Sequence, residues 1–264
     1  MSANSNNALT ILSQCSNICL AVVTIISVIV LFITYQYSRR KASIEKACEL
    51  ARIYAQEIIP KFCFIMQVLT HSGIYEKIKK AFPVQEIEMF NVKEMEMLCK
   101  KNGVSYSEID RMFLSINPQA IYESKLETII NGKAIKELED YYLLPSEDAS
   151  KVKYNNYALN ADFVQTLGEL QNLLEWFSMN FTRKLADEKI VYQSLHQTFL
   201  ANVHFLYFTI SKNNKTNSDK YFTNIILLFN AWENRLKKEK KKEDQAEMKI
   251  YKKTSKVKNL GATL

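Results

Sequence analysis

Glycine and proline are scarce in this chain, which has five glycines and four prolines in 264 residues. Tight hairpins and bulges depend on these two residue types, so their scarcity argues against a β-rich fold with many turns. Long helices need neither residue in their interior. The composition therefore favours an all-α fold.

Sequence motifs that bind nucleotide phosphates or zinc, or that expose a catalytic serine, are also missing. The chain has no Gly-x-Gly or Gly-Lys-Ser/Thr loop, no His-Glu-x-x-His helix and no Gly-x-Ser-x-Gly turn. Its five cysteines show no disulfide or zinc spacing, which is typical of a reducing compartment. We therefore expect no catalytic residues, no cofactor and no metal site.

Charged side chains are absent from one long apolar segment, residues 8–37. About 20 helical residues cross a hydrocarbon layer of ~30 Å, and this segment is longer than that. A cleaved signal peptide would instead have a basic start and a shorter apolar core. We therefore predict that residues 1–37 hold an N-terminal segment and a single transmembrane helix.

Arg39, Arg40 and Lys41 follow the apolar segment directly. Basic residues close to a membrane span stay on the cytoplasmic side, where they lie near anionic headgroups. We therefore predict that these three side chains contact the surface of the lipid bilayer. The same rule predicts an inner (cytoplasmic) membrane protein with its N-terminus outside and its C-terminal domain in the cytoplasm.

Polar residues within the apolar segment fall largely on one helical seam, with Ser13, Asn17, Thr24 and Ser27 among its members. Small and polar side chains on such a seam let membrane helices approach and form hydrogen bonds across an interface. The seam predicts a homo-oligomer. The alternative is that the hydroxyls bond to carbonyl groups of their own helix, as lipid-facing helices tolerate.

Residues 38–236 show the apolar spacing of amphipathic helices and predict a cytoplasmic helical bundle after the anchor. Pro60 predicts a kink or break near Ile59. Residues 133–158 lose the helical period and are predicted to form a connector. The last third carries the three clearest apolar stripes: Leu159, Phe163, Leu167, Leu170, Leu174, Phe177 and Phe181; Val191, Leu195, Phe199, Val203, Leu206 and Ile210; and Phe222, Ile225, Phe229, Trp232 and Leu236.

Helix ends inside this domain are marked by capping residues. Asn91, Ser105 and Asp187 suit N-cap positions, because their side chains can accept a hydrogen bond from the first turn. Gly73 and Gly132 suit the residue that follows a helix, where a left-handed conformation is common.

The net charge of +7 is concentrated near the C-terminus. Residues 235–258 hold eleven Lys or Arg against four Asp or Glu, a surplus of seven. Residues 237–264 have little apolar surface, so they predict a basic, flexible tail or a frayed, solvated helix. Contact with anionic lipid is an alternative. Nucleic acid is the less favoured partner, because only Tyr251 could stack on a base.

Tyr192, His196 and His204 form the one candidate polar site, on the helix that carries the second of the three stripes. The two histidines are separated by about two helical turns, and a shared metal would need a third ligand from another helix. The alternative is that all three are satisfied polar groups at the edge of the core.

Residues 185–199 and 219–226, together with Trp232, resemble an uncharacterised bacterial family. Its members look like single-pass membrane-anchored helical proteins of unknown function, and some similar proteins are labelled phage abortive infection proteins. The resemblance also covers the anchor and residues 57–60. It implies a role in anti-phage defence and carries over no functional residues.

The sequence as a whole predicts a membrane-anchored cytoplasmic module that acts through a protein partner or a homo-oligomer and not through catalysis. An alternative is a regulatory or scaffold subunit that brings a cytoplasmic partner to the membrane. A further alternative is an enzyme with a non-standard helical site around Tyr192, His196 and His204.

Overall fold

The computed structural model describes residues 2–128, 132–145, 152–214 and 220–261, and side chains are described from Leu20 onward except at residues 21, 132–134 and 250–261. The described chain is almost entirely helical, which confirms the all-α prediction. Its elements, in order, are α1 (Ser2–Ile53), η1 (Tyr54–Ile58), α2 (Ile59–His71), α3 (Ile74–Ala81), η2 (Val84–Glu86), α4 (Val92–Lys101), α5 (Tyr106–Leu114), α6 (Pro118–Thr128), α7 (Gly132–Tyr142), β1 (Leu143–Leu144), β2 (Lys153–Tyr154), α8 (Asn156–Thr182), α9 (Glu188–Phe205), α10 (Tyr207–Asn213) and α11 (Thr223–Gly261).

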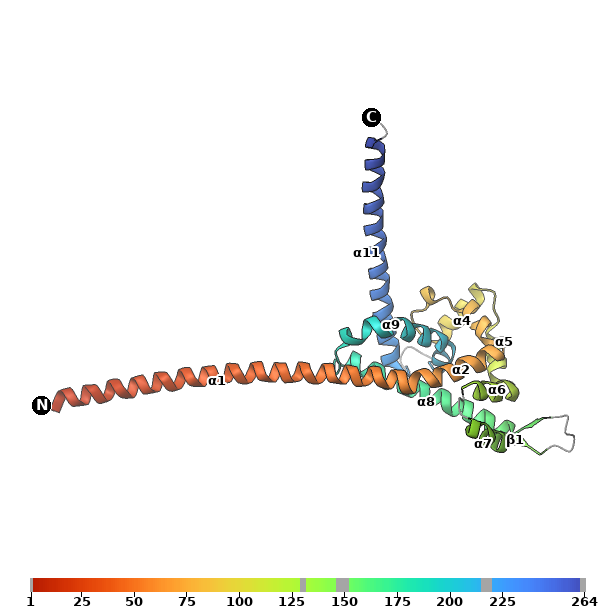
Figure 1. Cartoon of the computed structure of the whole chain (residues 1–264), viewed down its shortest axis with the longest axis horizontal. Helices are drawn as coiled ribbons and strands as arrows, with labels where there is room; N and C mark the ends of the chain where they lie inside the picture. Colours follow the sequence, from red (N-terminus) through yellow and green to blue (C-terminus); the bar gives the residue numbers. More distant parts are fainter. Residues whose placement is uncertain (1, 129–131, 146–151, 215–219, 262–264) are drawn as a thin grey trace.

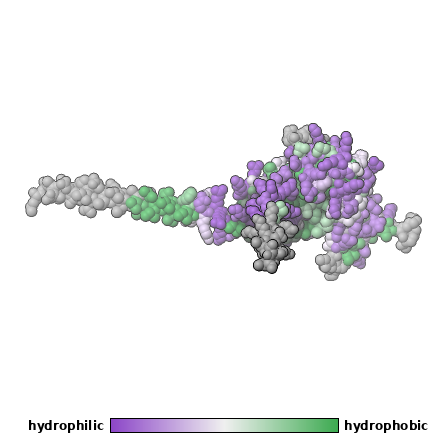
Figure 2. Space-filling view, turned by 90° about the horizontal axis from the view of Figure 1, so that it is seen from above, coloured by the Kyte–Doolittle hydropathy of each residue, from purple (hydrophilic) through white to green (hydrophobic). Residues whose placement is uncertain are grey.

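α1 projects from the body of the molecule as one long rod (Figure 1). Every described side chain of this helix up to Ala42 is exposed. Figure 2 shows the apolar part of the rod as a hydrophobic segment with hydrophilic surface where it meets the body. In the described chain, this is the one helix long and apolar enough to cross a membrane.

The chain passes from α1 into α2 through a π-helical turn, Tyr54–Ile58. The amide of Ile59 donates to the carbonyl of Tyr54, five residues back. Pro60 has no N–H to give to the carbonyl four residues before it, so the α-helical ladder is interrupted directly upstream. The kink or break predicted near Ile59 is thus present only as this π-helical turn, and the rod runs on into α2 without a loop (Figure 1).

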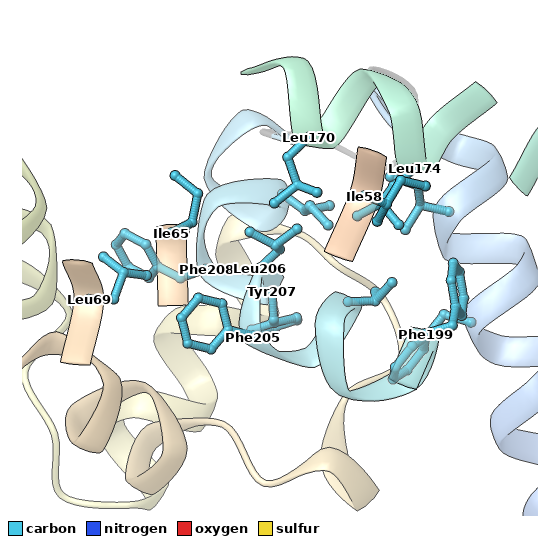
Figure 3. Packing of buried hydrophobic residues seen from close by; sticks show 14 of the residues in the cluster. Ile58, Ile65, Leu69, Leu170, Leu174, Phe199, Phe205, Leu206, Tyr207 and Phe208 are labelled. Carbon is cyan, nitrogen blue, oxygen red and sulfur yellow. The ribbon is translucent and has the colours of Figure 1, made fainter. Parts of the chain in front are cut away.

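The core lies where the end of α1, η1 and α2 pack against α8 and α9, and α11 packs against the same two helices. Figure 3 shows Ile58 and Ile65 facing Leu170, Leu174 and the side chains of α9 and α10. The three predicted stripes are confirmed as the buried faces of these helices. The second stripe is divided, because the helix is interrupted at Leu206 between α9 and α10.

Most of the predicted helix ends are also confirmed. The side chains of Asn91, Ser105 and Asp187 accept hydrogen bonds from the first turns of α4, α5 and α9. Gly73 follows α2 with a left-handed φ of 69°, which costs a glycine little. Gly132, predicted to follow a helix, is itself helical as a residue of α7, and residues 129–131 before it lie outside the described residues.

The stretch 133–158, expected as a connector, contains regular structure. It holds most of α7, an antiparallel pair of short strands and the first turn of α8. The buried Tyr142 at the end of α7 donates its hydroxyl to Asp162 Oδ2 of α8 at 2.9 Å, which ties this stretch to the bundle.

α11 continues as a helix through the basic segment and leaves the body crosswise to α1 (Figure 1). The tail, expected to be flexible or a solvated helix, is helical here as far as Gly261. Lysine and glutamate are good helix formers, so the helix extends past Glu233, the last buried residue among those of α11 whose side chains are described. Residues 240–249 are exposed.

Candidate functional site

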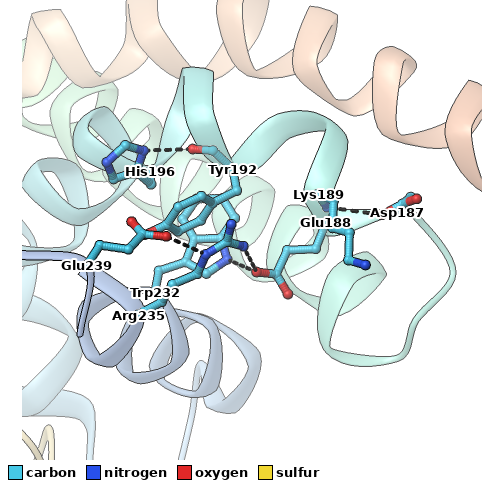
Figure 4. Close-up of polar contacts among 8 residues, drawn as sticks. All are labelled: Asp187, Glu188, Lys189, Tyr192, His196, Trp232, Arg235 and Glu239. Carbon is cyan, nitrogen blue, oxygen red and sulfur yellow. Dashed lines mark hydrogen bonds and ion pairs between the residues drawn. The ribbon is translucent and has the colours of Figure 1, made fainter. Parts of the chain in front are cut away.

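Tyr192 and His196 lie one turn apart on α9 and face α11 (Figure 4). Their rings stack with centroids 4.6 Å apart. His196 Nδ1 lies 2.7 Å from the carbonyl oxygen of Tyr192, which can only accept, so Nδ1 carries the proton. The hydroxyl of Tyr192 donates to Glu239 Oε2 of α11 at 3.0 Å.

Arg235 of α11 lies over the face of the Tyr192 ring, with Cζ 3.5 Å from the ring centroid. Its Nε donates to Glu239 Oε1 at 3.0 Å, and one terminal nitrogen lies 3.6 Å from Glu188 Oε1. A guanidinium held between an aromatic face and two carboxylates combines a cation–π contact with ion pairing. Most contacts of these side chains are thus with one another. We call the group the α9–α11 cluster and define it as Glu188, Tyr192, His196, Trp232, Arg235 and Glu239.

Trp232 anchors the cluster in the core. Its Nε1–H donates to Glu188 Oε1 at 3.0 Å, while the ring is fully buried. The ring meets those of Tyr192, Phe199 and Phe181 at centroid distances of 5.6, 4.9 and 6.3 Å. The cluster thus joins the first turn of α9 to the middle of α11.

The electrostatics of the cluster suit a structural contact. Burial raises the pKa of Tyr192 to about 12, and the hydrogen bond to Glu239 acts in the same direction. The hydrogen bond from Arg235 lowers the pKa of the Glu239 carboxyl. At neutral pH the phenol therefore stays protonated and the carboxylate stays ionised, so neither group is poised to transfer a proton.

A surface hollow of about 540 Å³ opens beside the cluster. Gln193, Gln197, Lys240 and Glu243 line it together with His196. Nε2 of His196 has no hydrogen-bond partner among the side chains that the structure describes. In the same described residues, no group of three or more His, Cys, Asp or Glu could hold a metal ion. The hollow can offer polar contacts to a partner.

His204 does not belong to this cluster. His204 follows Tyr192 by twelve residues. At ~100° for each residue this is three full helical turns and roughly 120° more, so the two side chains point in different directions. Its Nε2 instead contacts the carbonyl of Phe82, at the end of α3. The structure therefore brings together two of the three predicted site residues and places the third in a separate, half-buried position.

We expect stability to fall as His204 is protonated. Burial lowers the pKa of His204, and the carbonyl of Phe82 offsets this only in part. Because the unfolded histidine titrates near pH ~6.5, stability is fully present above that pH and is lost as pH falls toward the lowered pKa. The midpoint of thermal unfolding should therefore drop between about pH 7.5 and about pH 5.5.

A His204→Gln variant should show a smaller drop over the same pH range, measured by circular dichroism on the full chain. His196→Gln provides the matched change on the same helix. An unchanged pH dependence in His204→Gln would assign the effect to other groups.

One buried carboxylate was not identified from the sequence. Glu94 accepts hydrogen bonds from the amides of Glu88 and Met89 at 2.8 Å, the amide of Phe90 at 2.9 Å and the hydroxyl of Tyr207 at 2.8 Å. These four donors satisfy the carboxylate and hold the loop before α4, where Phe90 has a left-handed φ of 51°. The available signal was the spacing Asn91-x-x-Glu94, which is that of a capping box.

The predicted membrane residues lie along the rod of α1. Thr24 and Ser27 donate their hydroxyls to the carbonyls of Leu20 and Val23, each at 2.8 Å. The side chains of Ser13 and Asn17 lie outside the described residues, so the oligomer seam stays a prediction. Arg39, Arg40 and Lys41 are exposed where the apolar segment ends, and Lys41 Nζ lies 3.8 Å from Glu45 Oε1.

Comparison of the chain with known protein families, with characterised proteins and with solved structures finds no match.

Proposed function

We propose that this protein is a single-pass, membrane-anchored helical module that acts by binding a protein partner. The observation that carries the proposal is the exposed apolar part of α1. Of its side chains, Leu20 is 70% exposed and Leu31 is 68% exposed. Burying a large apolar side chain is favourable by about 1.5–3 kcal/mol, and a bilayer would supply this free energy for each exposed side chain of the segment.

The proposed orientation has the N-terminus outside and the helical body in the cytoplasm, at the inner membrane. It is supported by the basic residues Arg39, Arg40 and Lys41 at the body end of the apolar segment. Tyr35 and Tyr37 are exposed just before them, at the depth where aromatic side chains favour the interface.

A role in anti-phage defence is part of the proposal and depends on the family resemblance alone. The α9–α11 cluster supports a structural contact over catalysis, because the side chains of Tyr192, Trp232 and Arg235 donate to carboxylates within it. We further propose that the seam through Thr24 and Ser27 brings copies of the anchor together. This part of the proposal depends on the spacing of the polar residues alone, because both hydroxyls donate to carbonyls of their own helix, as the alternative expects.

A scaffold function is the second candidate. The exposed part of α11, residues 240–249, extends crosswise to α1 beyond the core. A projecting, charged helix offers a surface on which a cytoplasmic partner could dock without disturbing the bundle.

The proposal is tested by comparing the full chain with an Ile26→Arg, Ile29→Arg double variant in bacterial cells. A charged side chain at the centre of a span costs about 2.5–3.5 kcal/mol, so the variant should move from the membrane fraction to the soluble fraction. The matched control is Cys48→Arg, which adds a charge at an exposed position of α1 beyond the apolar segment.

Growth and phage survival are measured in the same cells, together with a His196→Ala, His204→Ala variant. If the cells lose protection against phage only with the arginine double variant, the protein acts as a membrane effector or recruiter. Loss of protection in the folded, membrane-bound histidine variant would overturn the non-catalytic proposal. An unchanged membrane fraction in the arginine variant would overturn the anchor.

A further inference from the structure

A second group of cations lies beside the basic residues that follow the apolar segment. The turn between α8 and α9 brings Arg183 and Lys184 to the same hollow as Arg39 and Arg40 of α1. This juxtamembrane hollow has a volume of about 480 Å³, within the range of small-molecule sites. Sequence reasoning found only the two α1 arginines of this set.

The turn is held against α1 by backbone hydrogen bonds. The amide of Asp187 donates to the carbonyl of Ser43 in α1 at 3.1 Å. Within the turn, the amides of Leu185 and Ala186 donate to the carbonyl of Asn180 at 2.8 and 3.1 Å. Lys184 has a left-handed φ of 58°, as expected where a helix ends in a tight turn. The positions of the cations are therefore set by the fold.

The charge of the hollow is not neutralised from within. Among the described residues, no ion pair involves Arg39, Arg40, Arg183 or Lys184. The one carboxylate of the lining, Asp187, is engaged as the N-cap of α9, where Oδ1 accepts from the amide of Lys189 at 3.0 Å. Like charges around one hollow repel each other, and an anion placed between them would remove that repulsion.

The location and lining of the hollow favour a lipid as the source of the anion. Gln36, which lies within the last residues of the apolar segment, is itself part of the lining. Leu185 sits among the cations with 56% of its surface exposed, as expected of a side chain that dips into the headgroup and acyl boundary. Arginine pairs with phosphate oxygens in a fixed, two-pronged geometry.

We propose that the juxtamembrane hollow binds the phosphate headgroup of an anionic phospholipid, with Arg39 and Arg40 on one side and Arg183 and Lys184 on the other. Leu185 contacts the lipid at the level of the acyl chains. This proposal depends on the membrane anchor proposed above. It adds a second contact far along the chain, which would fix the helical body against the membrane surface.

The test counts lipids bound to the purified full chain by native mass spectrometry in detergent. Phosphatidylglycerol and phosphatidylcholine are the two probes. The wild type should retain more phosphatidylglycerol than phosphatidylcholine. At about 1 kcal/mol for each basic residue near an anionic surface, an Arg183→Gln, Lys184→Gln variant should bind phosphatidylglycerol roughly 30-fold more weakly. The matched control is Lys79→Gln, Lys80→Gln at the exposed end of α3.

Two further arms separate the outcomes. Circular dichroism checks that the turn variant is folded, and sedimentation with membranes checks that it is still anchored, so a failed anchor is distinguished from a failed lipid site. Equal phosphatidylglycerol binding by the wild type and the turn variant would overturn the site. Displacement of the lipid by inorganic phosphate at equal phosphate concentration would assign the hollow to a soluble anion and overturn the lipid proposal.

Discussion

Replacement of Trp232 with alanine should lower the free energy of unfolding by about 3–5 kcal/mol, the usual cost of emptying a buried aromatic site. The ring of Trp232 is fully buried and contacts the rings of Tyr192, Phe199 and Phe181. Its loss would also remove the donor to Glu188 Oε1. Natural domains are stable by only about 5–15 kcal/mol, so the variant should sit close to unfolding.

The measurement is urea denaturation of the full chain in detergent, followed by circular dichroism. Trp176→Ala is the matched control, because the Trp176 ring is only partly buried and has Lys46 Nζ 5.3 Å from its centroid. We expect the loss for Trp176 to be less than half of that for Trp232. Equal losses would contradict the placement of Trp232 at the centre of the α8, α9 and α11 packing.

Replacement of Glu94 with alanine should have the second-largest effect. The change leaves three backbone amides and the hydroxyl of Tyr207 without their acceptor. A buried donor that loses its partner costs about 1–3 kcal/mol. Because neighbouring groups relax, the four costs do not add in full, and we expect the free energy of unfolding to fall by roughly 3 kcal/mol. The loop of residues 88–90 should also lose protection from amide hydrogen exchange.

The controls for Glu94 lie on the same helix and in the same network. Glu96→Ala, at an exposed position of α4, should change stability by no more than about 0.5 kcal/mol. Tyr207→Phe removes one of the four donors and should cost less than Glu94→Ala. Similar stability of the two alanine variants would show that the Glu94 network does not hold this loop.

Local signals in the sequence were sufficient for most of the helices and for many of their ends. The capping side chains of Asn91, Ser105 and Asp187 act on amides within three residues, so spacing alone identifies them. The irregular turn before Pro60 follows from one missing N–H in the same way. The buried stripes of α8 and α11 repeat at the helical period and needed no tertiary information.

Features that depend on contacts between distant segments could not be predicted. The strand pair and α7 are tied to the bundle through Tyr142 and Asp162, whose pairing no periodicity reveals. The periodicity of the second stripe also runs through Leu206, where the structure divides α9 from α10.

The candidate site shows the same limit. Tyr192 and His196 could be paired from their spacing of four residues along one helix. Arg235 and Glu239 come from α11, so their place in the cluster follows only from the packing of two helices. Arg183 and Lys184 reach the juxtamembrane hollow for a similar reason, since one hydrogen bond to Ser43 brings their turn to α1.

α1, η1 and α2 follow one another directly and form one continuous helical shaft. No loop separates the apolar segment from the core side chains Ala47, Leu50 and Tyr54. The hydroxyl of Tyr54 accepts a hydrogen bond from Asn202 of α9 at 2.8 Å, so the shaft is coupled to the neighbouring helix. With the apolar segment in a bilayer, a tilt or axial turn of the span would reach the core first at Ser43, Ala47 and Leu50, before the π-helical turn.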